Sequence, residues 1–157
     1  MKFHLRYVIL SFCVFFFLSG CSWNAITEKE LDQFIENENL DYVSIQKLND
    51  EEYYIFSLPY IYIYRSASDY TKSTGMIRDE IVIGGLEKGS IGLVINNTQV
   101  LKDAKTFSVV IDSKTREYEY TGEKYLIIKD SRIWNPTAQL KIIFSNDKNE
   151  TIFESDY

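Results

Sequence analysis

From Tyr42 onward, the chain consists of short segments rich in Ile, Val, Tyr and Phe that alternate with clusters of Asn, Asp, Gly and Lys. Such segments are typical of β-strands joined by tight turns. Strands are predicted near residues 42–48, 52–58, 60–65, 80–84, 91–95, 98–101, 107–112, 116–121, 123–128, 138–144 and 150–154. Because no long helical patterns separate them, a mainly β fold, a β-sandwich or barrel, is favoured over an alternating α/β fold.

Three pairs of polar residues are placed to form hairpin loops between these strands: Asn49-Asp50, Asn96-Asn97 and Asn146-Asp147. Asn and Asp tolerate the left-handed backbone conformation that tight hairpin turns require. Residues 66–79 show no clear period, and we expect them to form a long loop.

The segment that begins at Ile26 has a helical pattern instead. Thr27 can cap a helix, Glu30 can complete a capping box, and Ile26 and Leu31 occupy the positions of a hydrophobic staple. Leu31, Phe34 and Ile35 then share one face at helical spacing. The sequence therefore predicts a short amphipathic helix before the first strand.

Residues 1–20 have the order of a secretory signal peptide. Lys2 and Arg6 precede a nearly continuous apolar stretch from Tyr7 to Leu18, and two small residues follow it. A helix needs about 20 apolar residues to span a bilayer, so this stretch is short for a permanent membrane anchor. We expect residues 1–20 to be removed.

The residues at the predicted cut, Leu18-Ser19-Gly20-Cys21, resemble the lipobox of bacterial lipoproteins. The resemblance implies that Cys21 receives a diacylglyceryl group and becomes the first residue of the mature chain. Two acyl chains give stable membrane attachment, whereas one gives only marginal binding. The alternative is an ordinary signal peptide in which Cys21 falls near the cut by chance.

The predicted organisation is therefore a signal peptide at 1–20, a lipidated tether at 21–25 and one helix-plus-sandwich domain at 26–157. The domain would be held in the cell envelope, on the extracytoplasmic side of a membrane. Cys13 leaves with the signal peptide and Cys21 carries lipid, so no pair remains for an internal disulfide.

The C-terminal half is similar to the immunoglobulin-like β-sandwich modules of small bacterial surface lipoproteins. The similarity rests on the segments Asn96–Leu101, Phe107–Asp112 and the closing hairpin Leu140–Phe153. It implies a single immunoglobulin-like β-sandwich behind the N-terminal helix, and it transfers no functional residue.

The charge balance excludes one class of partner. Of 17 basic and 23 acidic residues, residues 1–20 hold two basic ones, Lys2 and Arg6, and no acidic one, so 15 basic residues remain and the mature chain carries a formal charge of −8. No basic run that could follow a phosphate backbone is present, so we expect no nucleic-acid partner. Acidity also opposes close contact with anionic lipid.

Common catalytic designs are missing from the mature chain. His4, the only histidine, lies in the signal peptide, and Cys21 is expected to be acylated, so no histidine base and no free thiol remain. We therefore expect no catalytic residue, metal or cofactor. Acidic residues at 50–52 and at Glu117 and Glu119 leave a glycoside hydrolase open, because that reaction needs two carboxyl groups about 5 to 10 Å apart.

The most unusual stretch of the mature chain alternates tyrosine with isoleucine. In a strand, Tyr60, Tyr62 and Tyr64 point to one face, and Ile61 and Ile63 point to the other, which we expect to face the core. An exposed tyrosine row would suit a contact with a protein or a sugar ring. In the alternative, the N-terminal helix or a loop covers the tyrosines.

Trp134 has the same two interpretations, a partner anchor or a plug at the end of the sandwich. Two functional hypotheses follow. In the first, the protein is a non-catalytic envelope lipoprotein that binds another envelope protein in a structural, sensory or protective role, through Tyr60, Tyr62, Tyr64 and Trp134. In the second, it binds or hydrolyses cell-wall glycan.

Overall fold

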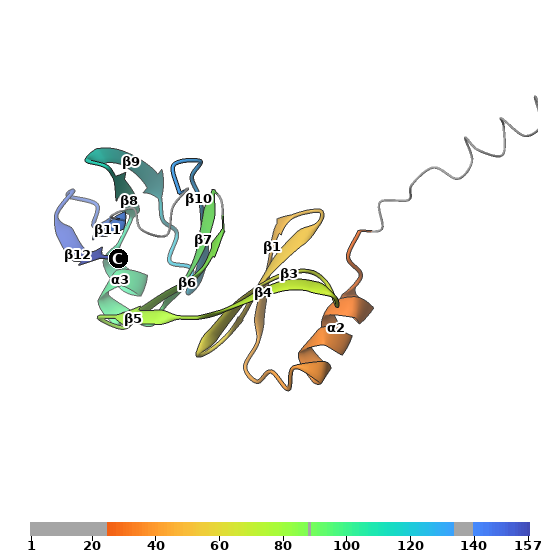
Figure 1. The fold of residues 1–157 in the computed structure, drawn as a ribbon. Coiled ribbons are helices and arrows are strands. Elements are labelled where there is room, and N and C mark those ends of the chain that lie inside the picture. Colours follow the sequence, from red (N-terminus) through yellow and green to blue (C-terminus); the bar gives the residue numbers. More distant parts are fainter. Residues whose placement is uncertain (1–24, 88, 134–139) are drawn as a thin grey trace, which may run out of the picture.

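The described part of the chain folds into three antiparallel four-stranded sheets and two short helices (Figure 1). The computed structural model describes residues 25–87, 89–133 and 140–157. The predicted signal peptide, Cys21 and Trp134 lie outside the described residues. The helices are α2 (Glu28–Asn37) and α3 (Thr98–Asp103).

Each sheet is built largely from neighbouring hairpins. Sheet A has the order β1-β2-β3-β4, with β1 (Ser44–Asn49), β2 (Glu52–Ser57), β3 (Tyr60–Ser66) and β4 (Asp69–Thr74). Sheet B has the order β10-β7-β6-β5, with β5 (Met76–Arg78), β6 (Ile81–Glu87), β7 (Ser90–Ile95) and β10 (Tyr125–Lys129). Sheet C has the order β12-β11-β8-β9, with β8 (Thr106–Ile111), β9 (Lys114–Glu119), β11 (Leu140–Ser145) and β12 (Thr151–Asp156).

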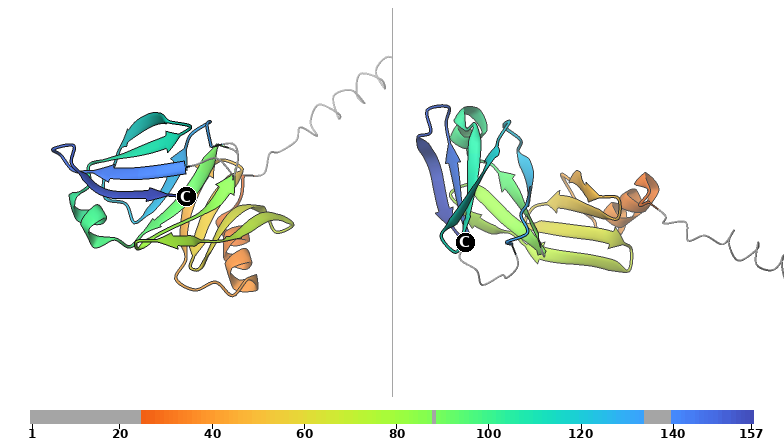
Figure 2. Two further views of the ribbon diagram at one scale, coloured as in Figure 1. Left: turned by 60° about the vertical axis from the view of Figure 1, so that its left-hand side comes forward. Right: turned by 90° about the horizontal axis from the view of Figure 1, so that it is seen from above.

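The predicted mainly β fold with a short N-terminal helix is confirmed. The single immunoglobulin-like β-sandwich is not confirmed, because the strands form three four-stranded sheets. Helix α2 and sheet A form one end of the molecule, and sheets B and C form the other (Figures 1 and 2).

Helix α2 begins as its sequence predicts. Thr27 accepts a hydrogen bond from the backbone of Glu30, and the Glu30 carboxylate accepts one from the backbone of Thr27, which completes the capping box. Leu31 and Phe34 are the buried residues of the helix. They pack against Ile55 and two tyrosines of sheet A, so the apolar stripe of α2 covers one face of that sheet.

The opposite face of sheet A packs against sheet B. Tyr54, Ile61 and Ile63 of sheet A share a core cluster with Val82 and Val94 of sheet B. The predicted core-facing position of the two isoleucines is thereby confirmed. Sheets B and C share a further, larger cluster that includes Ile81, Leu93 and Ile128 from one sheet and Val109, Ile142 and Phe144 from the other.

A glycine allows the close approach of sheets A and B. A Cβ atom at Gly92 would lie 2.9 Å from ring atoms of both Tyr54 and Phe56. The Tyr54 ring cannot easily retreat, because its hydroxyl donates a 2.6 Å hydrogen bond to the Gly85 carbonyl and lies 2.9 Å from the Ser90 hydroxyl. Burial raises the pKa of Tyr54. The contact between the two sheets is therefore tightly specified.

The prediction for residues 98–101 is wrong, since they belong to helix α3 and not to a strand. Asn97, expected in a hairpin loop, is the N-cap of this helix, and its side chain accepts a hydrogen bond from the backbone of Val100. One side-chain cap in a short segment outweighs the strand-like composition of Val100 and Leu101.

The expected loop at residues 66–79 contains β4 and β5. Most side chains of both strands are exposed. Without one buried face, the segment has no alternation of apolar and polar residues, and sequence reasoning therefore missed both strands.

Candidate functional site

An exposed tyrosine row, one of the two alternatives for Tyr60, Tyr62 and Tyr64, does not occur in the structure. Tyr62 and Tyr64 are 0 and 1% exposed, because Phe34 of α2 lies across them, with ring centroids 5.6 and 4.7 Å away. Tyr60 alone stays half-buried at the edge of the cluster. The alternative interpretation, in which the helix covers the tyrosines, is the one that the structure follows.

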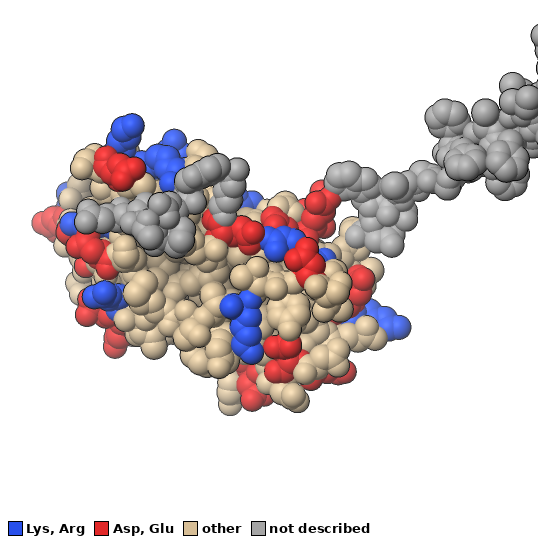
Figure 3. Space-filling view, viewed as in Figure 1, with Lys and Arg blue, Asp and Glu red and all other residues tan. Residues whose placement is uncertain are grey.

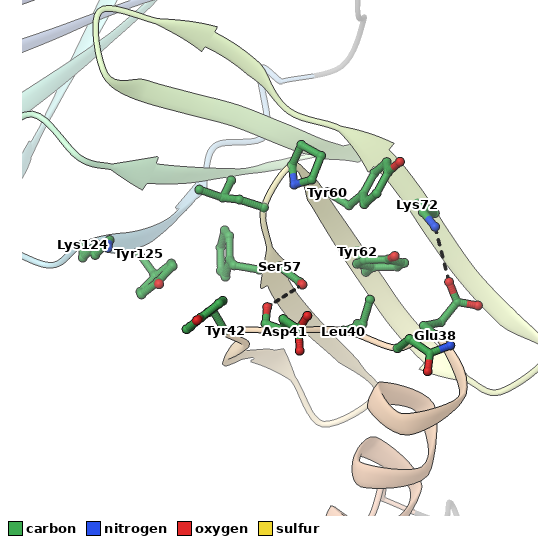
Figure 4. Close-up of a pocket in the computed structure, with 14 residues that line it drawn as sticks. Glu38, Leu40, Asp41, Tyr42, Ser57, Tyr60, Tyr62, Lys72, Lys124 and Tyr125 are labelled. Atoms are coloured by element: carbon green, nitrogen blue, oxygen red, sulfur yellow. Dashed lines mark hydrogen bonds and ion pairs between the residues drawn. The ribbon is translucent and has the colours of Figure 1, made fainter.

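A pocket of about 540 Å³ opens beside Tyr60, between the chain that follows α2, the β2–β3 turn and the start of β10 (Figure 4). We call this the aromatic pocket. Its rings come from five residues: Tyr42, Phe56, Tyr60, Tyr62 and Tyr125. Its volume falls within the range of about 300–1,000 Å³ that is usual for ligand sites.

Tyr42 stands at the rim of this pocket. Its side chain is 98% exposed, and its backbone has a φ of +52°, which is uncommon for a residue with a bulky side chain. A large ring that packs on nothing and sits on an unfavourable backbone contributes little to folding. Such outliers cluster at functional sites, which makes Tyr42 a candidate contact residue.

Two lysines mark the ends of the pocket (Figure 4). The Lys72 ammonium lies 4.3 Å from the centroid of the Tyr60 ring, and the Lys124 ammonium lies 5.7 Å from the centroid of the Tyr125 ring. Lys72 also forms a 3.5 Å ion pair with Glu38. Proximity to the Tyr62 hydroxyl, and then to Glu38, raises the pKa of Lys72, so this lysine is a cation at neutral pH.

The pocket floor holds a polar atom without a partner. The Tyr62 hydroxyl is buried, and within the described part of the chain it has no hydrogen-bond partner of normal geometry, although the Lys72 ammonium lies near it. By contrast, the Ser57 hydroxyl on the same wall donates to the Asp41 carbonyl at 2.9 Å. A buried hydroxyl normally has a partner, and the nearby Lys72 ammonium is the group placed to supply one.

The acidic residues considered for hydrolysis lie at two separate places. Asp50, Glu51 and Glu52 line a second pocket of about 590 Å³ together with Arg65. Glu52 binds Arg65 at 2.7 Å, and Arg65 also binds Glu87 at 2.6 Å, so these groups join sheets A and B. Glu117 and Glu119 are exposed on β9, in a different sheet. The structure therefore does not bring the two acidic groups together.

A buried ion network, which sequence reasoning missed, surrounds Asp130. Its carboxylate accepts hydrogen bonds from Arg132 at 2.6 Å, from the Tyr118 hydroxyl at 2.9 Å and from Arg116 at 3.3 Å. The Arg132 guanidinium outweighs the effect of burial and holds the pKa of Asp130 well below its ordinary value. Because every group in it is paired, we interpret this network as structural.

Acidic and basic side chains are interspersed over the face shown in Figure 3. Within residues 25–87, 89–133 and 140–157, no three His, Cys, Asp or Glu side chains gather into a group that could hold a metal ion. In the same ranges, neither helix has the length and apolar character needed to cross a membrane.

Comparisons with protein-family models, curated proteins and solved structures find no match to this chain.

Proposed function

We propose that the protein is a lipid-anchored, non-catalytic module of the cell envelope that binds another envelope protein through the aromatic pocket. The observation that carries this proposal is a pocket lined by five aromatic rings, two of them buried in its floor, with the exposed Tyr42 at its rim. Tyrosine supplies a large apolar contact with a polar tip, and it is enriched at the centres of protein interfaces.

The packing of the molecule supports this choice of surface. Tyr62 and Phe56 are held firmly in the core, so the pocket floor is rigid, while Tyr42 and Leu58 project from its rim with 98 and 47% of their surface exposed. A rigid concave floor with apolar rim residues favours binding, because little conformational entropy is lost when a partner docks.

Sheets B and C, with their shared core, would form the end of the domain farther from the anchor, because α2 and sheet A are its N-terminal elements (Figure 1). The immunoglobulin-like character of this pair of sheets is part of the proposal and rests on the sequence similarity alone. Lipid on Cys21 would supply the anchor. The chain between Cys21 and the start of α2 at Glu28 is only a few residues long, so α2 would lie close to that anchor.

The anchor is tested by Cys21→Ala. We expect the wild-type protein in the membrane fraction and in the detergent phase of a two-phase extraction, because two acyl chains give stable attachment. The alanine variant should lack the lipid mass. It should either leave the detergent phase after cleavage or remain as an uncleaved precursor. If Cys21→Ala still carries the lipid mass in excess of the mass calculated from its sequence, lipidation at Cys21 is contradicted.

The protein-binding role is tested by Tyr42→Ala. Cells that express the tagged protein are cross-linked, and material purified from membranes is identified by mass spectrometry. We expect one specific partner whose recovery falls about tenfold in the variant, because truncation of an important interface aromatic costs more than about 1 kcal/mol. Since the ring is 98% exposed, the thermal unfolding midpoint should stay within about 1 °C.

Ile77→Ala is the matched control, because Ile77 is 67% exposed on β5 and does not line the pocket. A partner that both variants retain would contradict the assigned surface, and the absence of any partner in the wild type would contradict the protein-binding role.

Glycan binding is the second candidate, because the same ring faces could stack on a sugar. Hydrolysis is not favoured at this pocket: the Glu38 carboxylate is engaged by the Tyr70 hydroxyl at 3.0 Å and by Lys72 at 3.5 Å. Binding of cell-wall fragments, abolished by Tyr42→Ala, would establish this candidate in place of the first.

A further inference from the structure

The aromatic pocket already supplies its own cations. A Lys or Arg of a partner would bind by resting on the face of a tyrosine ring, but Lys72 occupies that position at Tyr60 and Lys124 lies 5.7 Å from the centroid of Tyr125. A further cation would meet repulsion from both ammonium groups. The pocket is therefore suited to an anionic group that lies between apolar walls.

Lys124 has the greater capacity for such an anion. It is exposed and makes no ion pair within residues 25–87, 89–133 and 140–157. Lys72 has one carboxylate partner, Glu38, at the long distance of 3.5 Å, and such an exposed pair contributes little. A ligand carboxylate could therefore bind at either end without first breaking a strong contact.

Acidic side chains on the pocket wall limit where the anion can bind. Glu38 is engaged by Tyr70 and Lys72, whereas the exposed Asp41 lies midway along the wall (Figure 4). A ligand acid is therefore expected at a lysine end, with its apolar neighbour over the central rings.

We propose that the aromatic pocket binds a segment of the partner protein in which an acidic side chain stands next to an aromatic one. This inference rests on the proposed protein-binding function and specifies the chemistry of the partner. The mature chain is itself acidic, so overall charge would not attract such a segment, and its recognition depends on the two local lysines.

The test measures fluorescence polarisation of two labelled probe peptides, Gly-Phe-Glu-Phe-Gly amide and its Gly-Phe-Gln-Phe-Gly counterpart. The full chain, purified from membranes, is held in an uncharged detergent. We expect the glutamate peptide to bind about tenfold more tightly, because a hydrogen bond to a charged carboxylate is stronger than one to a neutral amide. Lys124→Gln should reduce this preference to about threefold or less, and Lys124→Arg should retain it.

Lys148→Gln is the control, because Lys148 is exposed in the β11–β12 hairpin and does not line the pocket. Equal affinity for the two peptides, or a preference that survives a combined Lys72→Gln and Lys124→Gln variant, would overturn the inference. Glucuronate that displaces the glutamate peptide, when neutral glucose does not, would support the carboxylate site. Binding of glucuronate with no binding of either peptide would overturn the inference in favour of an acidic glycan.

The two proposals fail in different ways. If cross-linking yields a partner that depends on Tyr42 and yet the probe peptides bind equally well, the protein-binding role stands and the acidic segment is wrong. If no partner is recovered, the protein-binding role itself fails, whatever the peptides show.

Discussion

Replacement of Asp130 by asparagine should lower the free energy of unfolding by about 3 kcal/mol, the cost expected when one member of a buried ion network is neutralised. The Asp130 side chain is fully buried, and it accepts hydrogen bonds from Arg116, Tyr118 and Arg132. An asparagine has one oxygen and places an NH₂ group against these donors. Arg132 would then be left partly buried without its counter-charge.

The position of Asp130 explains why the effect should extend beyond one loop. Asp130 follows the end of β10 in sheet B, and Arg132 donates further hydrogen bonds to the carbonyls of Val109 at 3.0 Å and Lys114 at 2.6 Å. Both carbonyls belong to the β8–β9 hairpin of sheet C. The network therefore joins the two sheets that share the largest core.

The same carboxylate predicts the pH dependence of stability. Its pKa is depressed in the folded state, whereas in the unfolded chain it has the ordinary value near 3.9. At pH 5 and above, the carboxylate is charged in both states, so its full stabilisation is present. Below about pH 4, the unfolded chain takes up a proton that the folded site does not, and the stabilisation is lost as the pH falls.

Urea unfolding of the wild type and of Asp130→Asn at several pH values between 7 and 3 tests both statements. The stability difference should be constant from pH 7 to 5 and should shrink below pH 4. Asp147→Asn, on the exposed β11–β12 turn, should change stability by less than about 0.5 kcal/mol. A difference independent of pH would show that packing, and not the charge of Asp130, holds this site.

Local sequence features predicted the fold wherever one face of an element is buried. The capping box at Thr27 and Glu30 and the alternation of Tyr and Ile in β3 both gave the correct element, because each is decided by neighbouring residues. The exposed β4 and the Asn97-capped α3 were missed, because neither has an apolar face that repeats with a clear period.

The candidate site could be predicted only in small part. Tyr60 and Tyr62 were identified as candidates, but Tyr42, Lys72 and Lys124 were not. These residues approach one another only when the chain after α2, the edge strand β4 and the start of β10 come together. The spacing of residues within one element does not encode the approach of these three segments. The burial of Tyr62 likewise depends on where α2 docks.

The docking of α2 depends on a small number of side chains, which makes Phe34→Ala informative. Phe34 is 4% exposed, and its ring lies 4.7 Å from Tyr64 and 4.8 Å from Tyr70 between centroids. Removing a buried phenylalanine ring costs about 3–5 kcal/mol. The ten-residue α2 is too short to be stable as an isolated helix, so we expect it to detach from sheet A and unfold.

Hydrogen exchange measured by mass spectrometry distinguishes this local loss from global unfolding. In Phe34→Ala, peptides that cover residues 28–37 should lose their protection by a factor of about 100 or more, while β11 and β12 should keep theirs, because sheets B and C have a separate core. Gln33→Ala, an exposed change on the same helix, should leave both regions unchanged. Retained protection of α2 in Phe34→Ala would mean that Phe34 does not hold the helix in place.

The same variant connects the helix to the candidate site. The end of α2 leads directly to Glu38, Leu40 and Tyr42, which form one wall of the aromatic pocket, and Tyr62 belongs both to the α2 contact and to the pocket floor. A detached helix would therefore displace that wall and release Lys72 from Glu38. Phe34→Ala should thus reduce partner recovery about as strongly as Tyr42→Ala, although Phe34 does not line the pocket. If recovery instead increases, the buried tyrosines, and not the pocket, form the contact surface.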